Sequence, residues 1–143
     1  MEIIIDGVFV MIDEAQTAAF YARAPELDCP CRDCLNFLQA LPRLPSKARD
    51  FMASIGVPLS KSTEVYSLER DEAGCLRYGG FTSVCGKLPE HVERTASWAF
   101  AEGCSVYFTR DRWLRHGDFP EPAMQMEFTL TLPWMLDTPR ESS

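Results

Sequence analysis

Three of the six cysteines in this sequence stand close together, and their type and spacing suggest chemistry more clearly than any other residues do. They form the run Cys29-Pro30-Cys31-Arg32-Asp33-Cys34. Thiolates are soft, charged ligands, and zinc takes four of them, or a mixture with imidazole, in a tetrahedron. We therefore predict that Cys29, Cys31 and Cys34 supply three zinc ligands from the start of one helix, whose positive end favours the thiolate form.

The fourth ligand is not fixed by the sequence, because there is no second Cys-x-x-Cys pair. Cys85, Cys104 and His91 are the candidates, since all three fall around one stretch of expected strands. Cys75 and Cys85 stand near opposite ends of one expected strand, which separates them by up to about 33 Å. They therefore cannot both join the cluster, nor pair as a disulfide, whose Cα atoms lie within about 7 Å.

Redox chemistry and simple packing are alternative interpretations of the same cluster. In a Cys-x-x-Cys pair at a helix start, one thiol has a depressed pKa and the second, one turn later, resolves the mixed disulfide. Against this interpretation, Asp28 and Asp33 flank the cluster, and negative charge raises a thiol pKa. No βαβ pattern surrounds it either. Packing as small buried hydrophobes is the favoured interpretation of the three scattered cysteines, Cys75, Cys85 and Cys104.

The elements around the cluster are expected to be a hairpin and three helices, over residues 2–12 and about 13–56. Asp6-Gly7 supplies the positive φ angles of a tight hairpin turn. Asp13 caps a helix that runs to about residue 23. A later helix runs from about residue 46 to 55, and Gly56 ends it. The sequence thus places helices on both sides of the cysteines.

The cluster itself is expected to start the middle helix. Asp28 or Cys29 is the predicted N-cap, with Pro30 in the first helical position, which proline suits. The helix should continue to about residue 40. Its predicted apolar face consists of Cys34, Leu35, Leu38 and Leu41.

From about residue 63 to 136, strands are expected to dominate. Residues 63–70 and 76–87 flank the turn signal at 71–74, and Gly79-Gly80 predicts a bulge in the second strand. Further strands are expected at about 98–100 and 104–109. A helix over residues 90–101 is the alternative for part of this stretch.

The clearest strand pattern covers residues 124–132. Met124, Met126, Phe128, Leu130 and Leu132 alternate with polar residues, which predicts one buried face and one wet or polar face. If that polar side faces solvent, it offers a surface or edge that another chain could use. The polar residues are Gln125, Glu127, Thr129 and Thr131. Glu127 is also expected to form a surface ion pair with an arginine of the basic stretch 110–116.

This order of elements predicts one α+β domain over residues 1–143. A mainly antiparallel β-sheet should carry two or three helices on one face, and residues 137–143 should form a frayed tail. Without a repeating βαβ unit, a doubly wound dinucleotide fold is not expected.

The cluster and its surroundings resemble a family of small bacterial proteins. The run from Cys29 to Phe37 is similar to its signature, C-x-C-x-x-C-x-N-[F/Y]. Three later stretches, beginning at Tyr78, Ser105 and Leu132, are similar to other recurring segments, as is Gly86-Lys87. The resemblance covers most of the chain and supports an intact single domain, but no catalytic role carries over from it.

Charge and composition narrow the class of partner. The net charge of −7 argues against a general nucleic-acid coat protein, which needs a phosphate-neutralising surplus of positive charge. Residues 1–31 contain six acidic residues against one arginine, a net charge of −5, which favours a basic protein partner. The longest unbroken apolar run, residues 8–12, is too short for a membrane span. Glu2 and Asp6 interrupt any secretory signal, so the chain is expected to be cytoplasmic, with reduced cysteines.

Neither histidine, His91 or His116, lies in a recognised catalytic motif. We therefore expect a non-catalytic protein-interaction module, with a structural zinc at Cys29, Cys31 and Cys34. A thiol-redox or metal-dependent enzyme that uses the same cysteines is the alternative.

Overall fold

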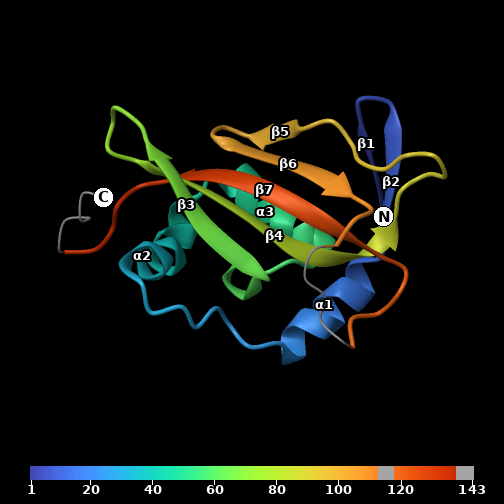
Figure 1. Ribbon diagram of the computed structural model, residues 1–143, viewed down its shortest axis with the longest axis horizontal. Coiled ribbons are helices and arrows are strands. Elements are labelled where there is room, and N and C mark those ends of the chain that lie inside the picture. The colour runs from blue at the N-terminus through green and yellow to red at the C-terminus, as the bar shows by residue number, and fades with distance from the viewer. Residues whose placement is uncertain (113–117, 138–143) are drawn as a thin grey trace.

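A computed structural model shows an α+β fold with three helices on one face of an antiparallel sheet, as the sequence predicts (Figure 1). The structure describes residues 1–112 and 118–137, so residues 113–116 of the basic stretch and 138–143 of the predicted tail lie outside it. Within these ranges, no helix is long and apolar enough to cross a membrane. The strands are β1 (Glu2–Ile5), β2 (Val8–Ile12), β3 (Glu64–Arg70), β4 (Leu76–Lys87), β5 (Trp98–Ala101), β6 (Cys104–Thr109) and β7 (Ala123–Leu132).

The helices begin and end close to their predicted signals. They are α1 (Glu14–Arg23), α2 (Arg32–Ala40) and α3 (Ser46–Ile55), with short 3₁₀ turns η1 (Leu41–Arg43) and η2 (Leu59–Lys61). The Asp13 carboxylate accepts a hydrogen bond from the Gln16 N–H at 3.0 Å and caps α1. Gly56 ends α3 with φ of 81°, which a side chain would disfavour.

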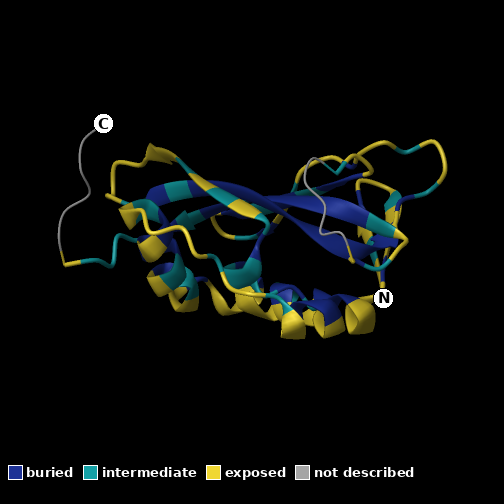
Figure 2. Cartoon of the chain, turned by 60° about the horizontal axis from the view of Figure 1, so that its bottom comes forward, coloured by how far each residue is buried: buried dark blue, intermediate teal, exposed yellow. Residues whose placement is uncertain are grey.

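The sheet is built around its two longest strands, β4 and β7. Its order is β1-β2-β4-β7-β6-β5, and β3 pairs with β4 beside β2. One face packs on the helices, and Figure 2 shows the sheet mostly buried while the outer surfaces of the helices are exposed. Core residues of this face alternate along β4 and β7 with outward-facing ones; examples are Leu76, Tyr78, Val84, Met126, Phe128 and Leu130.

The predicted bulge at Gly79-Gly80 is wrong. Both glycines pair in regular register with β3 and with β7, and the irregularity lies in β3, between Ser67 and Arg70. The glycines make room for rings instead. A Cβ on Gly79 would lie 2.5 Å from the Tyr66 ring, and one on Gly80 would lie 2.5 Å from the Phe128 ring.

The alternation in β7 is confirmed, but its polar side is neither wet nor an edge. β7 lies between β4 and β6, so it is not an edge. On its polar side Gln125 is only 1% exposed, and Glu127, with Phe81 and Tyr107 beside it in register, only 9%. The Gln125 amide nitrogen lies 3.3 Å from a Glu127 carboxylate oxygen. The expected surface ion pair of Glu127 does not form with the described arginines of the basic stretch. Arg112 pairs with Glu121, and Arg110 donates to the carbonyls of Pro89 and Val92.

The alternative helix over residues 90–101 is also wrong. Residues 98–101 form β5, which pairs with β6, and His91 adopts a positive φ of 76° in the connection before it. The strand interpretation is therefore confirmed for this part of the chain.

Candidate metal centre

Helix α2, which carries the cysteine cluster, is fixed to the sheet by two residues just beyond the cluster. The Phe37 ring is fully buried and lies 5.1 Å from the Tyr78 ring and 6.5 Å from the Phe128 ring, between centroids. The Asn36 side chain is fully buried as well. Its amide nitrogen donates to the Tyr78 hydroxyl and the Pro133 carbonyl, both at 3.1 Å, and its oxygen accepts from the Met135 N–H.

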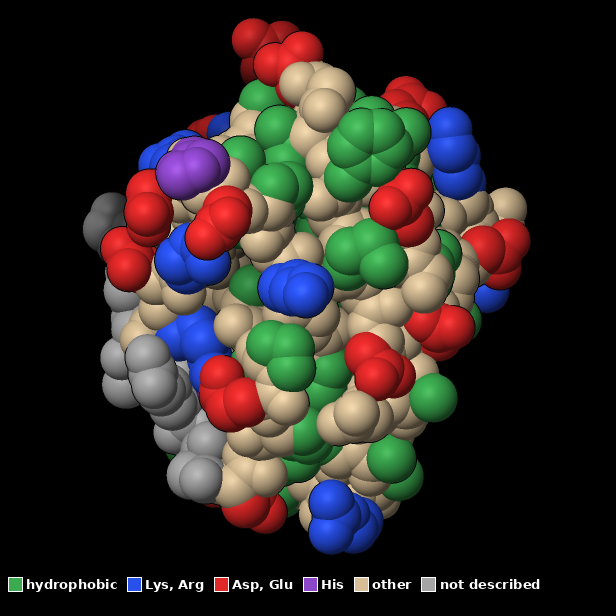
Figure 3. Space-filling model, turned by 90° about the vertical axis from the view of Figure 1, so that its right-hand side faces the viewer, with side chains coloured by type: hydrophobic (Ala, Val, Ile, Leu, Met, Phe, Trp, Pro, Cys, Tyr) green, Lys and Arg blue, Asp and Glu red, His purple; other side chains and the backbone are tan. Residues whose placement is uncertain are grey.

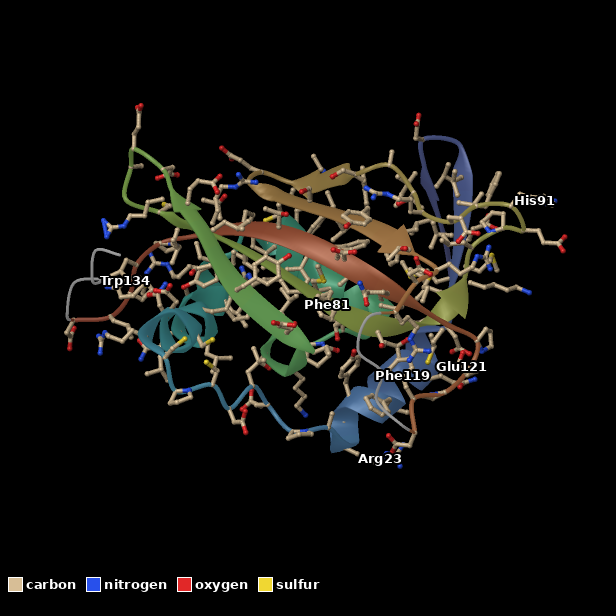
Figure 4. All side chains as sticks on the ribbon, in the orientation of Figure 1. Arg23, Phe81, His91, Phe119, Glu121 and Trp134 are labelled. Atoms are coloured by element: carbon tan, nitrogen blue, oxygen red, sulfur yellow. The ribbon has the colours of Figure 1, made fainter. Side chains whose placement is uncertain are left out.

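Tyr78 also holds the first turn of α2. Its hydroxyl donates a 2.7 Å hydrogen bond to the Asp33 carbonyl, between Cys31 and Cys34 in the sequence. Figure 4 shows Trp134, in the segment that Asn36 binds, at the same end of the molecule as α2. The sheet and the segment after β7 thus fix the turn from which the cluster projects.

Helix α2 begins later than the sequence predicts, and its buried face is shifted from the predicted one, although Leu38 and Leu41 still pack partly against the core. Cys31 is its N-cap, and the Cys31 Sγ accepts a hydrogen bond from the Cys34 N–H at 3.3 Å. Pro30 therefore precedes the helix rather than starting it. The buried residues are Cys34, Asn36, Phe37 and Ala40, whereas Leu35, placed on the predicted apolar face, is 42% exposed.

The three clustered sulfurs meet at this helix start. Sγ atoms of Cys29, Cys31 and Cys34 all lie within 4.8 Å of one another, and those of Cys29 and Cys31 are 3.3 Å apart. Cys29 and Cys31 are exposed and Cys34 is buried. The cluster is thus anchored on its inner side and open on its outer side.

The thiols differ in how easily each loses its proton. A hydrogen bond from the Cys31 N–H, helped by the Cys34 and Cys31 thiols, lowers the pKa of Cys29. Burial, together with hydrogen bonds to the other two thiols, raises the pKa of Cys34. The exposed Cys29 therefore takes the negatively charged thiolate form more readily than the buried Cys34.

These distances suit a tetrahedral soft metal ion. Ligands about 2.3 Å from a zinc ion, at the corners of a tetrahedron, lie about 3.8 Å apart. The three sulfurs reach that spacing with movements of about 1 Å or less. Loss of their protons on metal binding adds negative charge that the ion neutralises.

None of the three candidates for a fourth ligand lies in this cluster, which contains only Cys29, Cys31 and Cys34 within residues 1–112 and 118–137. Cys85 lies next to α1, where its N–H donates to the Thr17 hydroxyl at 3.0 Å. Cys104 pairs with Leu130 within the sheet. His91 is exposed at the opposite end of the molecule from α2 (Figure 4), the end that faces the viewer in Figure 3.

Sequence reasoning missed Asn36 and Tyr78, which position the cluster. The sequence holds a signal for each role. Asn36 stands in a predicted helix directly before Phe37, and Tyr78 stands beside two glycines in a predicted strand. No family model, curated protein or solved structure matches the chain. The resemblance to the small bacterial family therefore stays a prediction.

Proposed function

We propose that this chain is a protein-interaction module in which Cys29, Cys31 and Cys34 hold one zinc ion. The supporting observation is that three sulfur atoms lie within 4.8 Å of one another on a helix start that the sheet holds in place. When bound, zinc joins residues 24–31, which form neither helix nor strand, to the first turn of α2. The ion would act as a structural clip.

The open side of the cluster connects the clip with binding. Three protein sulfurs leave one position of a tetrahedron for water or for a residue of a partner. Exposure of Cys29 and Cys31 makes that position accessible from outside. The surplus of negative charge in residues 1–31 favours a partner with a basic surface. A reducing, cytoplasmic setting would keep these thiols available as ligands.

The metal part of the proposal is tested by the zinc content of protein purified under reducing conditions without chelator. We expect about one zinc per chain for the wild type. Cys31→Ser should lose most of it, because only Cys31 both caps α2 and lies 3.3 Å from Cys29. Cys75→Ser, in the turn between β3 and β4, is the matched control and should keep it. Equal zinc content in wild type and Cys31→Ser would contradict the proposal.

The interaction part needs its own comparison. Immobilised wild-type protein and Cys31→Ser, both folded by circular dichroism, would be incubated with extract of the native host. Partners that bind the wild type in a zinc-dependent manner, and have basic surfaces, support the proposal. If both proteins capture the same set while zinc is present, the clip is not needed for binding.

A thiol-redox role is the second candidate, and one observation favours it. An exposed Cys31 at the N-cap precedes a buried Cys34 with a raised pKa, the order in which one thiol attacks and its neighbour resolves. Both thiols would pass two electrons and two protons to a disulfide of a partner, forming a Cys31–Cys34 disulfide and two partner thiols. Equilibration of zinc-free protein with glutathione buffers tests this. If Cys31 and Cys34 form a single disulfide at the glutathione redox potentials found in cells, the redox role would be favoured over the clip.

A further inference from the structure

A second site candidate lies on the helical side, away from the cysteines. A pocket of about 700 Å³ opens between α1, α3, η1 and η2, lined mostly by apolar side chains. Binding pockets for small molecules have volumes of roughly 300–1,000 Å³ and a similar lining. The apolar side chains of the lining include Ala18, Ala22, Leu41, Leu44, Met52 and Val57.

The pocket exists because α1 and α3 approach closely at one point and carry small side chains beside it. A Cβ on Gly56 would lie only 2.6 Å from the Glu14 carbonyl oxygen and 2.8 Å from the Ala18 nitrogen. The two elements therefore touch at Gly56 and Ala18. Beyond that contact Ala22 and Ala53 face the space, and neither side chain is long enough to fill it.

Two cations stand in the lining of this apolar space. The Lys61 ammonium donates to the Tyr21 carbonyl at 2.8 Å, and the Arg49 Nε donates to the Leu44 carbonyl at 3.1 Å. Each cation has further N–H groups that these bonds do not use. Neither side chain forms an ion pair with an acidic residue in the described parts of the chain. No acidic residue contributes to the pocket lining that the structure describes.

The surrounding segment departs from the charge of the whole chain. Residues 41–61 contain four basic residues and one acidic residue, a net charge of +3, whereas the chain as a whole has −7. An apolar space lined by two cations, and by no carboxylate among the described residues, complements a molecule with an apolar chain and an anionic head.

We propose that this pocket binds a fatty-acid-type carboxylate with a single acyl chain. The chain occupies the space between α1 and α3, and the carboxylate accepts hydrogen bonds from Lys61 and Arg49. This site is independent of the cysteine cluster, so the proposal stands or falls apart from the zinc clip.

Calorimetric titration with monomeric carboxylates of increasing length tests the apolar half of the site. Each added methylene should tighten binding about fourfold until the pocket is full, the ratio that corresponds to about 0.8 kcal/mol per buried methylene. The alcohol and the trimethylammonium compound of equal chain length test the head group, and both should bind more weakly than the carboxylate. Equal binding of all three, or affinity that does not change with chain length, would overturn the proposal.

Variants separate this pocket from other surfaces. Ala53→Trp, at an exposed position of α3 that lines the pocket, should abolish binding without disturbing the core. Lys61→Glu with Arg49→Glu should weaken binding about tenfold, because two attractions become repulsions. Lys87→Glu, exposed at the end of β4 and outside both the lining and the segment 41–61, is the control and should bind as the wild type does.

Two further outcomes would count against the proposal. If Ala53→Trp folds, by circular dichroism and thermal unfolding, but binds as the wild type does, the ligand sits elsewhere. Binding to anionic vesicles, with none to the monomeric carboxylate, would show a membrane-surface site instead. Cys31→Ser should bind the carboxylate as the wild type does, which keeps this test distinct from that of the zinc clip.

Discussion

The two sides of the motif from Cys29 to Phe37 differ in almost every physical respect. On the sheet side, Asn36 and Phe37 are fully buried and bind residues far along the chain. On the outer side, Cys29 and Cys31 are exposed, and the hydrogen bonds described for their sulfurs join them to each other and to the Cys34 N–H. One short motif therefore combines an anchor, which is buried against the sheet, with a ligand set that opens to solvent.

Cys34 is the link between the two sides. Its side chain is 7% exposed, yet its sulfur lies in the cluster. Movement of α2 relative to the sheet would therefore move one ligand of the candidate metal centre. The following substitutions and measurements test this difference between the anchor and the ligand set.

Truncation of the anchor should have the largest effect. Phe37→Ala removes a buried ring from contact with Tyr78 and Phe128, so we expect the free energy of unfolding to fall by about 3–5 kcal/mol. Chemical denaturation measures it. Leu35→Ala, on the exposed side of the same helix, is the control and should cost much less. Equal losses for both variants would mean that α2 is not anchored as described.

Zinc should stabilise the fold through the ligand set. With free zinc at 100 times the dissociation constant, the free energy of unfolding should rise by about 2.7 kcal/mol, because zinc binds the folded state. Thermal unfolding of reduced protein with and without zinc measures this rise. Cys31→Ser should show almost none of it. A similar rise in the variant would place the zinc at other residues.

Loss of the buried amide should have an intermediate effect. Asn36→Ala leaves the Met135 N–H without its partner and removes two donors, so we expect a loss of about 1–3 kcal/mol. Gln39→Ala, exposed on the same helix, serves as control and should change stability by less than about 0.5 kcal/mol. Hydrogen exchange should report faster opening of α2 in Asn36→Ala alone; unchanged protection would argue against the bridge to the segment after β7.

Reactivity of the clustered thiols should change with pH, and the pH at which each reacts should differ from one thiol to the next. The pKa of Cys29 is lowered, so its thiolate forms at a lower pH than that of an ordinary thiol. The pKa of Cys34 is raised, so its thiolate forms only at higher pH. We would alkylate zinc-free protein over a range of pH and identify the modified cysteines by peptide mass spectrometry. Cys29 should be modified at a lower pH than Cys34. The reverse order would contradict the described hydrogen bonds.

Local signals allowed much of the fold to be predicted. Asp6-Gly7, Asp13 and Gly56 each act within a few residues, and β1, β2, α1 and α3 each begin or end beside one of them. The alternation in β7 was confirmed for the same reason. What failed depends on distant partners. Glu127 is buried where Phe81 of β4 and Tyr107 of β6 stand beside it in register, which its own strand does not reveal.

The candidate site was predictable to a similar degree. Sequence spacing alone brought Cys29, Cys31 and Cys34 together, because they stand in one turn. The buried face of α2 was misjudged because Asn36 is polar, and its partners Tyr78 and Pro133 are 42 and 97 residues away. A buried amide with distant partners cannot be recognised from helical periodicity.

X-ray absorption at the zinc edge tests the central claim most directly, since it reports the number and distance of sulfur ligands. For zinc-loaded wild-type protein we predict three sulfurs at about 2.3 Å and one oxygen or nitrogen at about 2.0 Å. Cys75→Ser should give the same spectrum, and Cys31→Ser should lose sulfur ligands. A zinc ion with one sulfur or none in the wild type would contradict the account.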